Sequence, residues 1–484
     1  MNKKILMTIV ALFVSTIFCA TVYAQDVKAP EDIRIGLYYG SSALGTITLS
    51  SPGGIEVGVM VDGEFEYIDE IPANKKIEIS RGKKAGSVYV DGIGDLGSKY
   101  EYPYFKSIED DDKSLISING KLYRGNVEIR RFSDSDMTVI NHLSMQEYLY
   151  GVVPREIGGN SPFEAVKAQA IVARTYATKN YGKRAKWGFD LYPTVDDQAY
   201  GGYTWENKNS NNAVDETCGK VIVYDGELIG GYYFSTSGGY TESSENVWVS
   251  KCDYLKAVPD IYEPEIEGNT TWEVEYTASE IKKKLASYGI DVGEIIDIVP
   301  CEYTEAGRVL ALEIIGTEGT EIITKSNTRT YLGLKSQWYT VNDEAPEVKE
   351  IDEDELPINN SSKTDGETDD EWWLKDGTED ENEDEECVTM KPNYSNDEDK
   401  FTVDKIVAMK PLLRQIIESI LSNKVETIEP EYAASSNKNT FTFRGRGWGH
   451  AVGMSQNGAK GMAEEGFSCE EIITWYYSGV EVID

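Results

Sequence analysis

Alternating hydrophobic and polar residues dominate the first quarter of the chain after an apolar leader. Between residues 26 and 125, segments such as IRIGLYYG, GTITLS and GGIEVGVMVDGEFEYI alternate or run apolar between glycine turns. A period of two residues is typical of β-strands. Residues 117–150 continue with SINGKLYRGNVEIRRF and MTVINHLSMQEYLYG, which predict two or three further strands. We therefore expect a β-rich module at 25–116 and a second domain whose first part covers 117–342.

In the stretch EYLYGVVPREIGGNSPFEAVKAQAIVARTYAT at 147–178, a Pro-Arg-Glu turn ends a short apolar run, and a helical period begins a few residues later. Small residues recur on one helical face, which predicts a closely packed helix. These residues are Val166, Ala170, Ala173 and Ala177. Ser161 as the N-cap, Pro162 at the first helical position and Glu164 closing a capping box predict where the helix starts. Glu156 lies just upstream, near the positive end of the expected helix.

Short elements of both kinds follow the central helix. The segment NNAVDETCGKVIVYDGELIGGYYFS predicts a helix, a hairpin turned by Asp225-Gly226, and a strand. Residues 270–342 combine an amphipathic helix, TASEIKKKLASYG, with the strands IDIVPCEY and RVLALEIIG. The C-terminal run FTFRGRGWGHAVGMSQNGAKGMAEEG predicts a strand, a glycine-rich loop and a helix. We expect an α+β fold in which mixed short strands and helices surround a substrate groove.

Charge is distributed very unevenly along the chain. Lys and Arg number 47 against 84 Asp and Glu, which gives a formal net charge of −37. A polyanion would be repelled by such a protein, so the charge argues against nucleic-acid binding but not against a carbohydrate substrate. Much of the excess lies in the low-complexity residues 343–400, which predict an acidic disordered insertion. An amphipathic helix is predicted at 401–424, and residues 401–484 are expected to complete the second domain.

The N-terminus has the pattern of a secretory signal. Lys3 and Lys4 precede the apolar run Ile5–Ala20, and Val22-Tyr23-Ala24 fits a cleavage site. We expect residues 1–24 to be removed, which would make the protein secreted or cell-wall located. An uncleaved signal would instead anchor it at the outer face of the membrane.

Cysteine and histidine usage argues against a metal site. Five cysteines remain after the expected cleavage, and none forms a CxxC pair. The two histidines, His142 and His450, are not close in sequence to a cysteine. We therefore expect no zinc site and no cofactor.

Two loops after the central helix carry candidate chemistry. The first, LYPTVDDQAYGGYTWE, interleaves aromatic residues with Asp196 and Asp197, which suits sugar rings with apolar faces and hydroxyl edges. An ordinary tyrosine-rich surface loop is the alternative. The second, STSGGYTESSENVWVSKCDYLKAVPD, has serines but no G-x-S-x-G motif, which argues against a serine hydrolase. Tyr254 and Lys256 are two residues apart, so both would face one side of a strand.

The C-terminal glycine-rich loop presents His450, Ser455 and Gln456. Its glycines allow close backbone approach or a positive φ. A phosphate-binding loop is an alternative, but the GKS or GKT ending of that motif is missing.

Five motifs in this order resemble the stage II sporulation protein D family, which includes amidase-enhancer-like wall proteins. They are EYLYGVVPREI, AVKAQAIVARTYA, YYFSTSGGYTESSENVW, YLKAVPD and RGRGWGHAVGMSQNGAKGMAEEG. The likeness runs from about residue 117 to 342 and resumes at about 440.

This resemblance implies a peptidoglycan lytic transglycosylase. Such an enzyme cleaves bonds between N-acetylmuramic acid and N-acetylglucosamine in glycan strands without stem peptides, and it forms 1,6-anhydro products. By the likeness, Glu156 is the catalytic acid and base, and Gln169 lies within the same motifs. The residues expected to bind substrate are Lys167, Arg174, Tyr254, Lys256, Ser455, Gln456 and His450. The implied partners are glycan strands and a wall amidase.

The chain departs from the family pattern in two places. Ala451 and Asn457 replace a glycine and a tyrosine of the usual GHGVGMSQYGA loop, which is expected to restrict the backbone and remove an aromatic ring. Some relatives carry zinc in the loop after the central helix. The cysteine and histidine that it needs are missing around 192–202.

The expected chemistry contains a conflict. A single catalytic carboxyl must stay protonated near neutral pH, which requires burial of Glu156 or an apolar wall. The helix N-terminus and nearby cations would act in the opposite direction. Lys167 and Arg174 are expected to bind the lactyl carboxylate of muramic acid without touching Glu156. A second carboxylate at Asp196 or Asp197 would favour simple hydrolysis instead.

Two other functions stay open from the sequence. One is a non-catalytic wall protein that binds glycan and stimulates an amidase. The other is an envelope scaffold that neither cleaves glycan nor binds it tightly.

Overall fold

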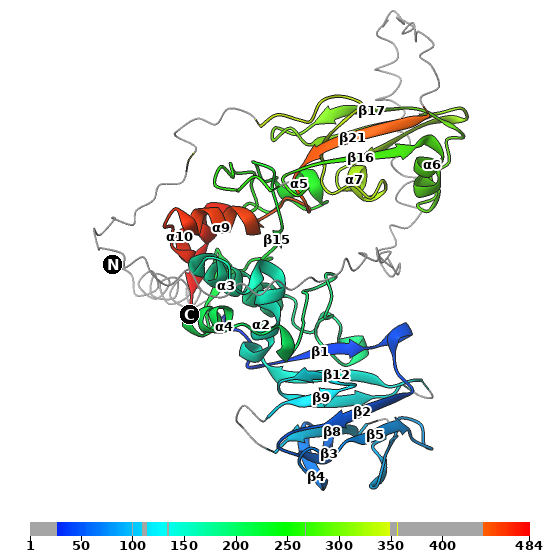
Figure 1. Cartoon of the computed structure of the whole chain (residues 1–484), viewed down its shortest axis with the longest axis vertical. Coiled ribbons are helices and arrows are strands. Elements are labelled where there is room, and N and C mark those ends of the chain that lie inside the picture. The colour runs from blue at the N-terminus through cyan, green and yellow to red at the C-terminus, as the bar shows by residue number, and fades with distance from the viewer. Residues whose placement is uncertain are drawn as a thin grey trace, which may run out of the picture. The chain divides into compact units, whose positions relative to one another are not determined.

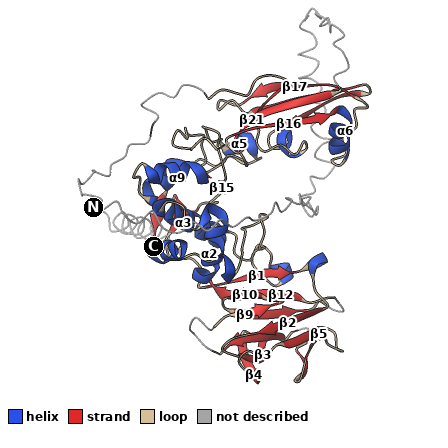
Figure 2. Cartoon of the chain, in the orientation of Figure 1, coloured by secondary structure: helices blue, strands red, loops and turns tan. Residues whose placement is uncertain are grey.

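The computed structural model describes residues 27–98, 100–108, 114–132, 135–266, 268–348, 356 and 439–484. The expected signal, most of the acidic insertion and the helix expected at 401–424 lie outside these residues. Helices and many strands in open sheets make up the described part (Figures 1 and 2), which confirms the α+β class. No helix in that part is long and apolar enough to cross a membrane.

Two six-stranded sheets form the β-rich part of the protein. Their strand orders are β1-β12-β11-β8-β3-β4 and β10-β9-β2-β5-β6-β7. The strands are β1 (Asp32–Tyr38), β2 (Thr46–Ser50), β3 (Ile55–Val61), β4 (Glu64–Ile71), β5 (Ile77–Arg81), β6 (Val88–Val90), β7 (Gly94–Leu96), β8 (Tyr102–Ser107), β9 (Ile116–Ile118), β10 (Lys121–Tyr123), β11 (Asn126–Arg130) and β12 (Thr138–Ser144). Alternate residues of both sheets, such as Ile47, Val57 and Ile129, are buried in one core. In both sheets, strands that precede residue 116 pair with strands that begin at or after it. The β-rich part therefore continues past the boundary that was expected at residue 116.

The helical centre begins earlier than the sequence pattern suggests. α2 (Met145–Val153) follows β12 directly, so the prediction that the end of MTVINHLSMQEYLYG is a strand is wrong. A capping box starts this helix: Ser144 Oγ accepts a hydrogen bond from the Glu147 N–H, and the Glu147 carboxylate accepts one from the Ser144 N–H. The S-x-x-E pattern at 144–147 is the sequence signature of this capping box.

α3 (Phe163–Lys179) is the predicted central helix, but its predicted N-cap is wrong. The cap position falls on the proline after Ser161, and no side chain caps the helix. The Ser161 hydroxyl instead donates to the Ile157 carbonyl at 2.7 Å. Glu164 Oε2 accepts a hydrogen bond at 2.8 Å from the backbone N–H of the first residue of α10 (Cys469–Tyr476). A tertiary contact thus takes the carboxylate that was expected to close a capping box.

Small sheets and short helices surround α3. The predicted helix and hairpin after it are confirmed, and Asp225 and Gly226 both have positive φ in the hairpin turn. These elements are α4 (Lys208–Glu216), β13 (Val221–Tyr224), β14 (Glu227–Leu228), β15 (Tyr233–Phe234), α5 (Ser244–Val247), β22 (Met454–Ser455), α9 (Gln456–Glu464) and β23 (Glu481–Ile483). β15 pairs in parallel with β22, which brings the C-terminal loop beside the middle of the chain.

A second hydrophobic core organises the segment after α5. Its elements are β16 (Thr271–Thr277), α6 (Ala278–Ala286), β17 (Ile295–Tyr303), β18 (Val309–Gly316), β19 (Gly319–Thr324), α7 (Asn327–Thr330), β20 (Trp338–Val341) and β21 (Thr440–Arg446). β21, orange in Figure 1, pairs with β16 and with β20. Leu312, Tyr339 and Phe443 are buried in this core, so the C-terminal strand is part of it.

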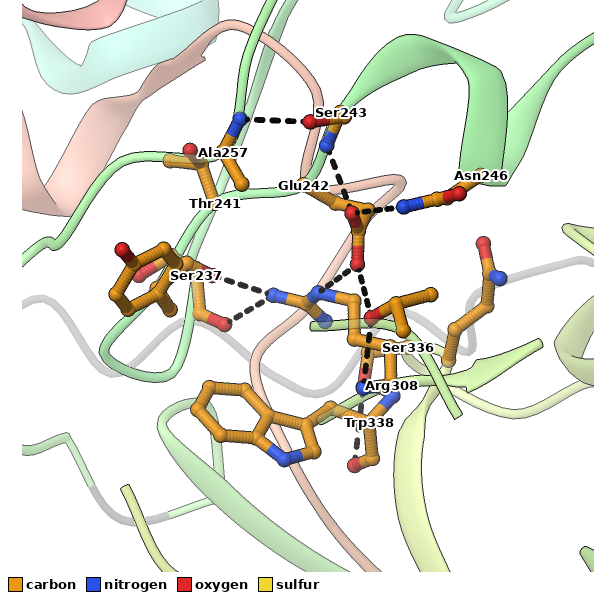
Figure 3. Close-up of polar contacts among 12 residues, drawn as sticks. Ser237, Thr241, Glu242, Ser243, Asn246, Ala257, Arg308, Ser336 and Trp338 are labelled. Carbon is orange, nitrogen blue, oxygen red and sulfur yellow. Dashed lines mark hydrogen bonds and ion pairs between the residues drawn. The ribbon is translucent and has the colours of Figure 1, made fainter. Parts of the chain in front are cut away.

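A buried ion pair joins this segment to the loop after β15 (Figure 3). Arg308 Nε lies 4.0 Å from Glu242 Oε2, and both side chains are 1% exposed. Arg308 also donates to the carbonyls of Ser237 (2.8 Å) and Tyr240 (2.7 Å). Glu242 accepts a hydrogen bond from the Thr304 hydroxyl at 2.6 Å. A buried ion pair and several hydrogen bonds therefore fix the conformation of the loop.

Replacement of Arg308 by Met is expected to lower the free energy of unfolding by about 3–5 kcal/mol, because Glu242 would stay buried without its counter-charge. Arg444→Ala is the matched control, since the pair between Arg444 and Glu273 is exposed and such pairs contribute below about 1 kcal/mol. Urea denaturation measures both changes. Equal losses in the two variants would contradict this assignment.

Candidate functional site

Glu156 lies on a five-residue π-helical segment, η2 (Pro154–Gly158), directly after α2. Proline has no N–H and its ring crowds the preceding turn, so the hydrogen bonding of α2 cannot continue unchanged. π-helical turns are frequent at functional sites. The segment therefore turns Glu156 away from the regular α2 face.

Groups from three other parts of the chain hold the Glu156 side chain. The Ala199 N–H donates to Glu156 Oε1 at 2.7 Å. The side chains of Tyr233, on β15, and Gln456, on α9, lie beside Glu156, and each lowers its pKa as a hydrogen-bond donor does. Burial has the largest effect on the pKa of Glu156 and raises it, although these three donors act in the opposite direction. The carboxyl therefore keeps its proton to higher pH than a solvated glutamate does.

A chain of hydrogen bonds behind Glu156 orients Tyr233. Gln198 Nε2 donates to Tyr233 Oη (3.2 Å) and to the Ala173 carbonyl (3.3 Å). Gln198 Oε1 accepts from Tyr148 Oη at 3.2 Å. Because Tyr233 Oη accepts from Gln198, its own proton is available for Glu156.

Gln169 lies on α3 beside the same group. Gln456 Nε2 donates to Gln169 Oε1 at 3.3 Å, which links α9 to α3. Gln169 Nε2 is buried and has no hydrogen-bond partner among the described residues.

Asp197 anchors the loop that supplies the Ala199 N–H. Its carboxylate is fully buried and accepts from Lys183 Nζ (2.8 Å), Arg184 Nε (3.0 Å) and the Tyr192 N–H (2.8 Å). These contacts fix the loop between α3 and α4. They also occupy the carboxylate that was considered as a second catalytic acid, while Asp196 is exposed.

His450 packs between two aromatic rings. Its ring centre lies 5.5 Å from that of Phe234 and 5.3 Å from that of Trp248. His450 Nδ1 accepts a hydrogen bond from the Val452 N–H at 3.1 Å. Burial lowers the pKa of His450 to about 3, so the ring is neutral at physiological pH.

The expected substrate-binding cations lie in contacts with the protein. Lys167 Nζ is 2.7 Å from Glu164 and 3.4 Å from Glu216. Arg174 is 1% exposed and donates to the carbonyls of Lys220 (3.1 Å) and Val214 (3.3 Å). Their roles in substrate binding stay predictions, and these contacts place neither cation on Glu156.

The expected residues of the second loop lie in different contacts. The stretch around Tyr254 and Lys256 is a turn and loop, so the prediction that both share a strand face is wrong. Tyr254 Oη accepts a hydrogen bond from the Gly230 N–H at 3.0 Å, and Lys256 is exposed. Ser455 is the N-cap of α9 and is fully buried. Its neighbour Gln456 is thereby directed to Glu156.

Two departures from the family motif have visible consequences. Ala451 has a φ of 66°, in the left-handed region that favours glycine, and its carbonyl accepts from the Glu242 N–H at 2.7 Å. Asn457 donates to Thr236 Oγ1 at 2.9 Å. Among the described residues, no group of three His, Cys, Asp or Glu side chains could hold a metal ion.

Known proteins match the part of the chain that contains the candidate site. A family model described as stage II sporulation protein matches residues 133–224, which contain Glu156, Gln169 and Ala199. The amidase enhancer of Bacillus subtilis (strain 168) is 29% identical over 373 residues, which are 75% of this chain and 44% of that protein. The chain therefore contains a stage II sporulation protein domain and is similar to the amidase enhancer.

Other relatives match a similar share of the chain. The stage II sporulation protein D of Bacillus subtilis (strain 168) is 24% identical over 364 residues, 71% of this chain and 75% of that protein. An uncharacterized protein of Brachyspira hyodysenteriae is 26% identical over 383 residues, 79% of this chain and 77% of that protein. The chain spans only 44% of the length of the amidase enhancer. Residues 262–353 match a domain of unknown function (DUF8618), which corresponds to much of the second core.

Sequence reasoning missed Tyr233 as a neighbour of Glu156. The tyrosine stands in YYFSTSGG, one of the motifs of stage II sporulation protein D, but its hydrophobic neighbours resemble an ordinary strand. Gln198 and Gln169 were visible as polar residues inside apolar or aromatic stretches, a pattern that favours a buried hydrogen-bonding role.

Tyr233→Phe is expected to raise the pKa of Glu156 further, since the substitution removes one of the donors that stabilise the ionised carboxylate. Titration of the side-chain carboxyl by ¹³C NMR measures this shift. Tyr254→Phe, which removes a hydroxyl bonded to Gly230, is the control and should leave the titration unchanged. A lower pKa in Tyr233→Phe would show that Tyr233 does not donate to Glu156.

Proposed function

We propose that the protein is a peptidoglycan lytic transglycosylase with Glu156 as its catalytic acid and base. The observation that supports this most is one carboxyl with a raised pKa, held by a backbone N–H and neutral side chains. The family resemblance supplies the reaction, and the glycan strand of the cell wall is the proposed substrate. The protein would act outside the cytoplasmic membrane, either secreted or anchored by its N-terminal segment.

The proposed reaction uses the two protonation states of Glu156 in turn. The protonated carboxyl donates to the oxygen that bridges N-acetylmuramic acid and N-acetylglucosamine, and the C1–O bond of the muramic residue breaks. The carboxylate then takes the proton of the muramic C6 hydroxyl, whose oxygen bonds to C1 and closes the 1,6-anhydro ring. Atoms and charge balance without water, and Glu156 ends protonated.

Hydrolysis by two carboxylates is less well supported. A hydrolase needs a second carboxylate to activate water or to attack the sugar. Asp197 follows the central helix closely, but its carboxylate is engaged by Lys183 and Arg184. This arrangement favours the single-carboxyl reaction.

A non-catalytic role is the second candidate. The name of the amidase enhancer, one of the relatives, supports a protein that binds glycan and stimulates a wall amidase. In that case Glu156 and its neighbours would bind sugar without cleaving it.

Glu156→Gln is expected to reduce glycan cleavage by on the order of 10²–10⁴-fold, because it removes the proton donor and acceptor but keeps the side-chain shape. Purified peptide-free glycan strands are incubated with each protein, and the products are weighed by mass spectrometry. Anhydro products from the native protein support the transglycosylase. Products heavier by one water would indicate hydrolysis, and binding without cleavage would indicate the amidase-enhancing role. Glu164→Gln, which changes a carboxylate bonded to Lys167, is the control.

Stability should reveal the raised pKa independently of activity. A carboxyl whose pKa is higher in the folded than in the unfolded state loses stabilisation as pH rises through the folded value. Glu156→Gln lacks this loss, so its thermal midpoint relative to the native protein should increase from acidic to alkaline pH. Differential scanning calorimetry over a pH series measures the trend. A difference between the two proteins that does not vary with pH would contradict the raised pKa.

A further inference from the structure

A cavity of about 270 Å³ lies beside the loop after β15 and the start of β16. At roughly 30 Å³ per water, this is room for about nine waters or one small polar group with its linker. Three carboxylates and one guanidinium are among its lining groups. The residues concerned are Asp260, Glu263, Glu265 and Arg446, together with Gly238 and Gly239.

Asp260 has an unpartnered oxygen in this lining. The side chain is 3% exposed, and its Oδ1 accepts from Tyr476 Oη at 2.6 Å. Its Oδ2 has no hydrogen-bond partner among the described residues. The Ser237 and Ser455 hydroxyls lie nearby, but each donates its one proton to Glu263, at 2.9 and 3.4 Å. A buried carboxylate oxygen without a partner is unfavourable, and burial raises the pKa of Asp260, so a donor from outside would stabilise its ionised form.

Glu263 lies beside Asp260, and its pKa is raised. It accepts from the N–H groups of Ser237 (2.9 Å) and Gly238 (2.6 Å). Burial first, and then the charge of Asp260, raise the pKa of Glu263 to about 8. Glu263 therefore carries a proton at neutral pH when the cavity holds no cation.

The one cation that lines the cavity does not neutralise this pair. Arg446 donates to the Gly238 carbonyl at 2.8 Å and to Glu265 at 3.0 Å. In the described part of the chain, no lysine or arginine forms an ion pair with Asp260 or Glu263. The buried Arg308 lies near enough for its charge to act on Glu263, but Glu242 balances that charge at 4.0 Å. The carboxylates that line the cavity therefore outnumber the cation that lines it.

We propose that this cavity binds a protonated primary amine. An ammonium group has three N–H donors and no acceptor, which matches Asp260 Oδ2 and the carboxylates of Glu263 and Glu265. A metal ion fits less well, since the described residues contain no group of three ligating side chains suited to it. The cavity is also tied to the candidate site, because Ser455 bonds to Glu263 and the next residue, Gln456, bonds to Glu156.

Two groups of a cell-wall polymer contain such a primary amine. One is an amino sugar that lacks its N-acetyl group, and the other is the side-chain amine of a diamino acid in a wall peptide. Only this choice of sources rests on the proposed function; the binding of an amine does not.

Calorimetric titration of the full chain with glucosamine and with Nα-acetyl-lysine methylamide tests the inference. Their controls are N-acetylglucosamine and the Nε-acetylated lysine derivative, which have no positive charge. At least one amine is expected to bind about tenfold more tightly than its control, as a charge-assisted hydrogen bond to a buried group predicts. The amine that binds more tightly identifies the source.

Proton release distinguishes this site from a surface contact. Because an ammonium group would displace the proton of Glu263, the binding enthalpy at pH 7 should depend on the ionisation enthalpy of the buffer. Titrations in phosphate and in Tris measure this dependence. A proton count of zero overturns the proposal.

Asp260→Asn is expected to reduce the affinity for the amine about tenfold. If that variant does not fold, Glu265→Gln takes its place, since the Glu265 side chain is 72% exposed and its loss should weaken binding about twofold to fivefold. Glu302→Gln, an exposed carboxylate on β17 that does not line the cavity, is the matched control and should bind like the native protein.

Equal affinity of each amine and its acetylated control overturns the proposal. Binding of Ca²⁺ without binding of either amine does so as well. Glycan cleavage without amine binding would overturn this inference alone, and amine binding without cleavage would overturn the transglycosylase proposal alone.

Discussion

The return of the C-terminal segment to elements formed much earlier in the chain is the constraint on which the site depends. β21 completes the sheet between β16 and β20, β22 pairs with β15, and α9 begins immediately afterwards. These pairings close long loops, whose entropic cost must be offset by burial in both cores. Gln456 meets Glu156 because of this return, so the site is complete only in the fully folded chain.

Buried polar groups in this fold are stabilised chiefly by main-chain carbonyls and amides. Arg174 donates to two carbonyls near α4, and Arg308 donates to two carbonyls of the loop after β15. Glu263 accepts two backbone N–H groups. Such contacts tie a charged side chain to a particular backbone conformation, which specifies the loop geometry as well as neutralising part of the burial penalty.

Local signals in the sequence predicted the elements well where the pattern was self-contained. The helix and hairpin at 208–228 and the strand at 440–446 are examples, since helical periodicity, the Asp-Gly turn and alternation are all local. The capping box at Ser161 failed because the Ser161 hydroxyl donates to the Ile157 carbonyl, and because α10 takes Glu164 by a contact between residues 305 positions apart. The strand expected at Tyr254 failed because period-two spacing also occurs in loops.

The candidate site was predictable to the extent that its residues stand in motifs. Glu156 and Gln456 were identified from the sequence and lie together, whereas Tyr233 was not singled out. The contacts of Arg174 could not be read from a motif, because a buried arginine bonded to carbonyls and an arginine that binds substrate look the same in sequence. Only the surroundings of the guanidinium distinguish the two.

The choice of neighbours around Glu156 has a physical reason. A lysine or arginine against the carboxylate would favour the ionised form and lower its pKa, which is the conflict that the sequence raised. Two cations of α3 are engaged elsewhere: Lys167 with Glu164 and Glu216, and Arg174 with carbonyls. The nearby Arg155 stacks on Trp205, with 4.0 Å between the guanidinium carbon and the ring centre, and its charge lowers the pKa of Glu156 less than burial raises it.

Neutral donors take the place of those cations. Tyr233, Gln456 and the Ala199 N–H orient the Glu156 carboxyl and still leave its pKa raised, because their dipoles stabilise the anion less than burial penalises it. Gln198 in turn fixes the direction in which Tyr233 donates. An uncharged hydrogen-bond network can therefore hold a carboxyl in one position while it remains able both to give and to take a proton.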